Sequence, residues 1–189
     1  MGQAGEILAK APLDQFGTFE VFVRPREGKP FQHEGIVHAP NSEMAFILAK
    51  ENFTRRFACT ALYVAETRHV FVSPMTEDTQ NAYDLIPGDV DSAGSEESYE
   101  IYHLLKRGKQ HVHAGTVQAT NPKQAMLHAK KDFAGRTVLN IWSLRTADIR
   151  FTTPEEEDLW ATLPEKKFRD ASAYKGGEKL KEFLERVQS

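Results

Sequence analysis

The chain has 189 residues, of which 40% are hydrophobic, and its formal net charge is -3. This composition excludes a wholly disordered chain, and so weak a charge gives no general attraction to nucleic acid or to an anionic membrane. No apolar run approaches the roughly 20 residues of a membrane-spanning helix, and the single cysteine, Cys59, excludes an intramolecular disulfide and paired-thiolate zinc sites.

The N-terminal residues lack the basic start and apolar stretch of a secretory signal, so we expect a cytoplasmic protein. The first predicted element is a strand over residues 19–24, which are rich in aromatic and β-branched side chains. Gly28 then supplies a hairpin turn. A second strand is predicted over residues 35–39.

A helix and a third strand follow this hairpin. Asn41 is a strong helix N-cap, because its side chain can accept a hydrogen bond from an unpaired backbone N–H. The helix after it carries Ala45, Ala49 and Phe53 at a spacing of four, which places them on one face. A strand over residues 60–64 completes a ββαβ unit.

The same order of elements returns after residues 86–98, which contain turn-forming and acidic residues without periodicity and predict a flexible linker. The segment from Phe19 matches the segment from Tyr99 at a constant offset of 80 residues, without a gap. The identical pairs include Glu20/Glu100, Gly28/Gly108, His33/His113, Gly35/Gly115, Phe53/Phe133, Arg56/Arg136 and Phe71/Phe151. Such self-similarity predicts a second copy of the ββαβ unit.

We therefore expect an α+β protein of two tandem ββαβ units, covering residues 17–85 and 99–165, with a helical tail at 166–189. One such unit alone buries a small fraction of its surface and leaves strand edges open. The two units should pack as an internal pseudo-dimer, the covalent equivalent of a homodimer. A further homo-oligomer remains an open alternative.

The tail places Leu180, Phe183, Leu184 and Val187 on one face of a predicted helix. An apolar stripe of this kind docks on another surface. We favour packing within the chain over a surface for a partner, because such stripes usually face a core.

Candidates for chemistry are few. His111 and His113 lie two residues apart on a predicted strand, but no third ligand stands at a suitable spacing. Glu66 and His69 match half of a helical di-iron motif, which needs a second copy and further glutamates. Cys59 corresponds to Leu139 in the second copy at the offset of 80, so we interpret Cys59 as a small apolar side chain of the core. We predict no catalytic, metal-binding or cofactor-binding residue in this chain.

Arginines stand at the ends of both predicted helices, Arg55 and Arg56 in the first copy and Arg136 in the second. Cations at a helix C-terminus complement the helix dipole, which is worth about 0.3–1 kcal/mol. A sharper alternative is an electrostatic docking patch for an acidic partner. We favour the dipole interpretation, and the patch remains an alternative.

Three short stretches of the first copy resemble the PaaB family, the non-catalytic B subunit of bacterial phenylacetyl-CoA epoxidase. They are Phe-Glu-Val-Phe-Val-Arg from Phe19, His-Glu-Gly-Ile-Val-His-Ala from His33, and Phe-Thr-Arg-Arg from Phe53. The second copy keeps Tyr-Glu-Ile-Tyr from Tyr99 and His113, but departs from the pattern at Gln118. The resemblance covers about residues 17–165, and the departure is the duplication, since family members are usually one unit long.

The resemblance implies an α/β roll of the ββαβ type and membership of a multicomponent oxygenase. A different subunit would carry the di-iron site, a reductase subunit would supply electrons, and the B subunit would bridge or position the catalytic subunit and its structural partner. The candidate subunit-interface residues are His33, His38, Arg55, Arg56, His113 and Arg136.

Rival functions differ in what they require. A stand-alone protein that binds an aromatic-CoA ligand is the runner-up, and that ligand would raise its melting temperature. A free-standing enzyme would need a pocket lined by both His33 and His113. A nucleic-acid module would need a basic face with exposed aromatic side chains, against which the acidic linker and the negative charge argue.

Overall fold

The computed structural model describes residues 16–54, 59–77, 79–88, 94–133, 135–156 and 176–188. Half one (residues 16–88) contains β1 (Gly17–Arg24), β2 (Gln32–Ala39), α1 (Ser42–Phe53), β3 (Ala61–Glu66), the 3₁₀ turn η2 (Thr67–His69), β4 (Val70–Val72) and η3 (Ala82–Leu85). Half two (residues 94–156) contains β5 (Glu97–Leu104), β6 (Val112–Ala119), α2 (Pro122–Phe133), β7 (Asn140–Arg145), η4 (Thr146–Asp148), β8 (Ile149–Phe151) and η5 (Pro154–Glu156). The chain is thus a mixed helix and strand protein, and β5 begins inside the predicted linker.

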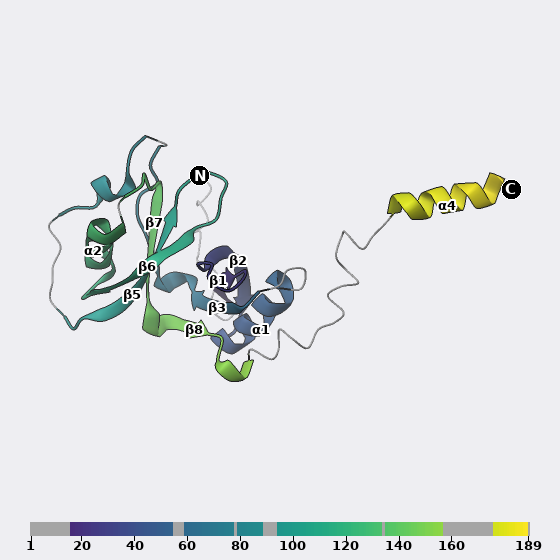
Figure 1. The fold of residues 1–189 in the computed structure, drawn as a ribbon. Helices are drawn as coiled ribbons and strands as arrows, with labels where there is room; N and C mark the ends of the chain where they lie inside the picture. The colour runs from purple at the N-terminus through teal and green to yellow at the C-terminus, as the bar shows by residue number, and fades with distance from the viewer. Residues whose placement is uncertain are drawn as a thin grey trace, which may run out of the picture.

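The eight strands of the described residues form one antiparallel sheet in the order β4-β7-β5-β6-β2-β1-β3-β8 (Figure 1). The halves meet where β2 lies beside β6. The last strand of each half crosses over, because β4 pairs with β7 and β8 pairs with β3. The sequence pattern predicts three strands per unit and does not indicate these two short crossing strands.

The constant offset of 80 residues is wrong beyond the helices. Phe19 pairs with Glu66 in half one, whereas Tyr99 pairs with Arg145 in half two, so the offset there is 79. Phe71 therefore corresponds to Arg150 and not to Phe151. For the same reason the counterpart of Cys59 is Val138 and not Leu139. Cys59 and Val138 lie in the equivalent cores of the two halves.

Each helix covers one face of its own half of the sheet. Asn41 caps α1 by accepting a hydrogen bond from the Met44 backbone N–H at 2.9 Å, as predicted. Ala45 and Ala49 are fully buried, which lets α1 lie close to the strands. The core under α1 consists of Phe19, Val21, Val23, Val37, Ala39, Ala45, Phe46, Ala49, Cys59, Leu62 and Val64. A second core lies under α2 in the same way.

A third core joins the two halves and contains residues of both. It is built from Phe22, Tyr63, Ala65, Tyr102 and Leu144. Val70 of β4 and Ile149 of β8, from the two ends of the sheet, pack against the same cluster. The sheet is therefore curved, and the halves share a hydrophobic centre dominated by aromatic rings, whose burial is a major stabilising contribution.

The C-terminal helix α4 (Gly176–Gln188) is drawn apart from the sheet in Figure 1. Leu180, Phe183 and Leu184 of its apolar stripe are exposed, and the side chain of Val187 lies outside the described residues. Among the described residues, no helix is long and apolar enough to cross a membrane.

Candidate functional site

The seam between the halves brings His33 and His113 together. Gln32 and Val112 are paired across it. The His33 backbone N–H donates to the His111 carbonyl at 2.9 Å, and the His113 N–H donates to the Phe31 carbonyl at 2.8 Å. These two reciprocal bonds place the two histidines at matching positions on either side of the seam.

Each of these histidines is hydrogen bonded to a glutamate of its own half. His33 Nε2 lies 2.7 Å from Glu20 Oε2, and His113 Nε2 lies 2.7 Å from Glu100 Oε2. Both glutamates are buried, although they are ionisable. A buried carboxylate is tolerated only when hydrogen bonds replace its water. The Glu–His pair is therefore a structural element that occurs once in each half.

The carboxylate of half two has more donors than that of half one. Glu100 accepts from Thr116 at 2.8 Å and from Thr146 at 2.9 Å, in addition to its bond with His113. Burial raises the pKa of Glu100, but these three hydrogen bonds outweigh burial and hold the pKa below its ordinary value. Ile36 occupies in half one the position of Thr116.

His111 lies at the seam in half two only, because half one has Phe31 at that position. Its ring stacks on Trp142 with centroids 4.0 Å apart. Its Nε2 lies 2.8 Å from Asn140 Oδ1, and Asn140 in turn donates to the Ser73 carbonyl at 2.7 Å. Burial lowers the pKa of His111, so its imidazole is neutral near pH 7.

The two pairs that were weighed as metal ligands, His111 with His113 and Glu66 with His69, do not converge. Side chains of His111 and His113 have different partners, Asn140 and Glu100. Glu66 forms an ion pair with Arg68, whereas His69 lies 3.8 Å from Asp148 of half two. Within the described ranges, no group of three or more His, Cys, Asp or Glu side chains could hold a metal ion.

Of the remaining interface candidates, His38 and Arg136 lie away from the seam. His38 is exposed at the end of β2, where its Nδ1 lies 3.4 Å from the Thr18 hydroxyl. Arg136 is exposed beside a cavity of about 280 Å³ that Phe133 also lines. Arg55 and Arg56 lie outside the described residues. A single patch of all six residues is therefore not seen, and their contact with other subunits stays a prediction.

Comparison with known proteins decides the family. Residues 15–85 and 96–181 each match the family described as "Phenylacetic acid degradation B", or PaaB. The chain belongs to the PaaB family. This confirms the resemblance and its occurrence in two copies, and it links the chain to phenylacetic acid degradation. No curated protein and no solved structure matches the chain.

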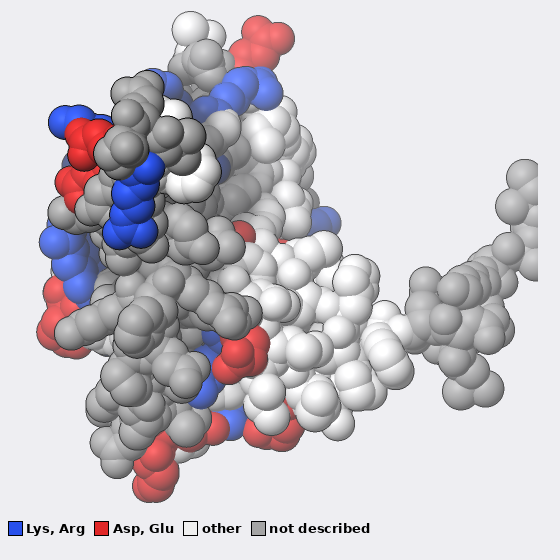
Figure 2. Space-filling model, turned by 90° about the vertical axis from the view of Figure 1, so that its right-hand side faces the viewer, with Lys and Arg blue, Asp and Glu red and all other residues white. Residues whose placement is uncertain are grey.

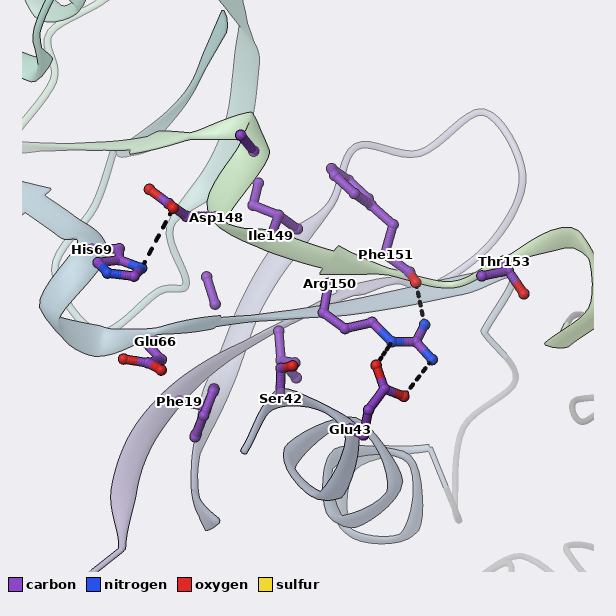
Figure 3. A pocket seen from close by; sticks show the side chains of 13 residues that line it. Phe19, Ser42, Glu43, Glu66, His69, Asp148, Ile149, Arg150, Phe151 and Thr153 are labelled. Atoms are coloured by element: carbon purple, nitrogen blue, oxygen red, sulfur yellow. Dashed lines mark hydrogen bonds and ion pairs between the residues drawn. The ribbon is translucent and has the colours of Figure 1, made fainter. Parts of the chain in front are cut away.

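The crossing of β8 creates a groove in this PaaB chain that the sequence pattern does not predict. The groove has a volume of about 710 Å³ and lies between α1, β8 and the turns η2 and η4 (Figure 3). Arg150 donates to Glu43 of α1 at 2.9 and 3.0 Å and also binds Glu156, and its guanidinium lies 4.1 Å from the centre of the Phe46 ring. These bonds lower the pKa of Glu156 to about 2, with Arg150 as the main cause.

The groove offers little for binding beyond these internal contacts. Arg150 already has two carboxylate partners, and the His69–Asp148 contact lies at the other end of the groove (Figure 3). In Figure 2, an area without Lys, Arg, Asp or Glu lies among charged side chains above it, below it and to its left. A charged side chain that is already paired within the chain has less left to offer a ligand.

Proposed function

We propose that this PaaB chain is a non-catalytic subunit of a multicomponent di-iron phenylacetyl-CoA ring epoxidase. In this role it bridges or positions the catalytic subunit, its structural partner and the reductase subunit in the cytoplasm. The observation that carries the proposal is the family match, which includes both halves of the chain.

The state of the polar groups at the seam supports a non-catalytic role. A general acid or base must lie within hydrogen-bond reach of a substrate atom. Glu20 and Glu100 are buried and bond to residues of their own half, and His33 and His113 are their partners. Their geometry suits fixing the strands beside the seam better than proton transfer.

The arrangement of the halves supports a fused equivalent of a homodimer of ββαβ rolls. In a two-fold symmetric interface, each contact occurs twice with the roles exchanged. The paired bonds of His33 and His113 with the opposite strand have this property, as does the crossing of β4 and β8. We infer that His33 and His113 serve this internal interface and that His38, Arg136 and the arginines at 55 and 56 face other subunits.

Reconstitution of the epoxidase tests the proposal. The catalytic, structural and reductase subunits are purified with and without this chain, and complex size and epoxidation of phenylacetyl-CoA are measured. We expect the chain to co-purify with the oxygenase subunits and both assembly and turnover to fall without it. Full assembly and full turnover in its absence would contradict bridging.

A thermal-shift titration with phenylacetyl-CoA separates the runner-up function. A ligand that binds the native state must raise the melting temperature. We expect no rise for the isolated chain. A rise that saturates with ligand concentration would instead indicate a binding protein for the aromatic-CoA ester.

A further inference from the structure

Two apolar stripes of the chain face solvent, one on α1 and one on α4. Met44 and Ile47 of α1 are 42% and 53% exposed, three residues apart on the outer side of the helix. Leu180, Phe183 and Leu184 of α4 are 59%, 62% and 49% exposed. A helix as short as α4 is marginal in water without a packing partner, so its stripe requires a surface.

The crossing of β8 brings the tail of half two to half one. Since β8 pairs with β3, the chain after it runs beside α1 and not beside α2. Arg150 fixes this position by binding Glu43 in the first turn of α1 and Glu156 in η5. The described body therefore ends next to the helix with the exposed stripe.

Half two provides a precedent within the same molecule. The segment that follows β4 packs on half two, where the Ala82 N–H donates to the Val138 carbonyl at 2.7 Å. The Tyr83 hydroxyl oxygen lies 2.6 Å from His103 Nε2, and Asp84 accepts a hydrogen bond from Lys130 of α2 at 3.0 Å. The segment that follows the crossing strand β4 thus packs on the helix and strands of the opposite half.

The two helices differ where this precedent predicts. The positions of α2 that correspond to Met44 and Ile47 are Gln124 and Leu127, and both are partly buried. Gln124 also accepts from the Thr120 N–H at 2.6 Å. An exposed apolar pair is therefore a feature of α1, the helix beside which the tail begins.

We propose that α4 packs lengthwise on the outer face of α1, with its apolar stripe over Met44 and Ile47. The helices have 12 and 13 residues, so each is roughly 18–20 Å long and their stripes match in length. Residues 157–175 can span about 60 Å when extended, which is ample for this contact. The inference does not rest on the epoxidase assignment.

Engineered cysteine pairs test the contact in the full chain. Cys59 is first replaced by valine, the residue at its counterpart Val138. Ile47→Cys with Leu184→Cys is then compared with a matched control, Leu127→Cys with Leu184→Cys, after oxidation in dilute solution. The tether to α4 is the same in both pairs, whereas docking holds residue 184 beside residue 47, so we expect on the order of tenfold more intrachain disulfide in the first pair.

Each result decides the matter. Equal yields in the two pairs, or no disulfide in either, would overturn the proposal. A disulfide-linked dimer in place of the intrachain product would assign the stripe to a second copy and overturn it too. As a second measurement, Phe183→Ser should raise amide hydrogen exchange in α1 and leave α2 unchanged, whereas unchanged exchange in α1 would contradict docking. Each of these results is independent of whether the chain binds an oxygenase.

Discussion

The two halves share a Glu–His pair beside the seam and carry different residues at their crossing strands. Glu20–His33 and Glu100–His113 have the same hydrogen bond at the same distance. Arg150 of β8 is bound by two carboxylates, whereas its counterpart Phe71 of β4 is 49% exposed. The duplicated Glu–His pair is thus retained in both halves, whereas the residues of the outer strands have changed.

The layers under the helices show the same contrast. His103 of half two is buried against the Tyr83 hydroxyl, and burial, with help from His111 and His113, lowers its pKa to about 4. Half one has Val23 at that position, in an apolar core. A buried hydrogen bond from His103 therefore holds the segment around Tyr83 on half two. The side chain of Val23 cannot form such a bond in half one.

The largest expected effect concerns Gly35 and Gly115, which lie against the rings of Phe53 and Phe133 at the ends of α1 and α2. A Cβ at Gly115 would lie 2.3 Å from the Phe133 ring, compared with 2.9 Å between Gly35 and Phe53, and both glycines have positive φ. We expect Gly115→Ala to lower the free energy of unfolding by about 2–4 kcal/mol through strain and overpacking. Urea unfolding measures this loss, with Gly35→Ala as the milder control. A larger loss for Gly35→Ala would break the comparison.

The second prediction concerns the buried carboxylates. Glu100→Gln should lower the free energy of unfolding by about 1.5–3 kcal/mol at pH 7, because hydrogen bonds to a charged acceptor are lost. Glu20→Gln should cost less, because Glu20 has fewer donors in the described structure. Equal losses in the two variants would show that the additional threonine donor is unimportant.

The lowered pKa of Glu100 also fixes a direction for pH dependence. A carboxyl whose pKa is lower in the folded state than in the unfolded state stabilises fully above the unfolded value, near 4.5, and that contribution is lost as the pH falls through the folded pKa. The free energy of unfolding should therefore fall less steeply between pH 7 and pH 3 for Glu100→Gln than for the parent chain. A parallel decline would contradict the assignment.

A smaller effect is expected from the aromatic centre. The hydroxyl of Tyr102 is buried without a hydrogen-bond partner among the described residues, and Phe22 is its counterpart in half one. Tyr102→Phe should therefore be neutral or raise the free energy of unfolding by up to about 1 kcal/mol, since an unsatisfied buried hydroxyl is removed. Phe22→Tyr is the inverse control and should be destabilising. A clear loss in Tyr102→Phe would indicate that a buried water satisfies the hydroxyl.

The smallest effect is expected at β4. Phe71→Arg gives β4 the residue of β8 and should change the free energy of unfolding by no more than about 0.5 kcal/mol, as exposed substitutions usually do. Arg150→Phe should cost more, because it leaves Glu43 and Glu156 without their shared cation. Thermal unfolding of both variants measures the difference, and a reversed order would refute this account of the outer strands.

Much of the fold could be predicted because its signals are local. Asn41 and the spacing of Ala45, Ala49 and Phe53 predict α1, and the repeat transfers the prediction to α2. The crossing strands could not be predicted in this way, because a three-residue strand has little periodicity and its partner lies in the opposite half. The change of offset from 80 to 79 was also missed, since a few chance identities such as Phe71/Phe151 conceal it.

The seam was partly predictable. Glu20 and His33 recur as Glu100 and His113, which marks positions with a shared role, although nothing in the sequence shows that each histidine bonds to the glutamate of its own half. His111 could not be separated from His113 as a ligand pair, because nothing in the sequence shows that His111 precedes β6 and bonds to Asn140, whereas His113 bonds to Glu100. The groove around Arg150 depends on β8 and could not be foreseen without it.

The exchange of end strands has a consequence for how this protein comes apart. A single cut between residues 88 and 94 would separate two chains that each still supply the outermost strand of the other. The fragments would remain one particle in native buffer and part only in denaturant, much as a subunit-swapped dimer does. Neither fragment made alone would have all the strands of its own half of the sheet.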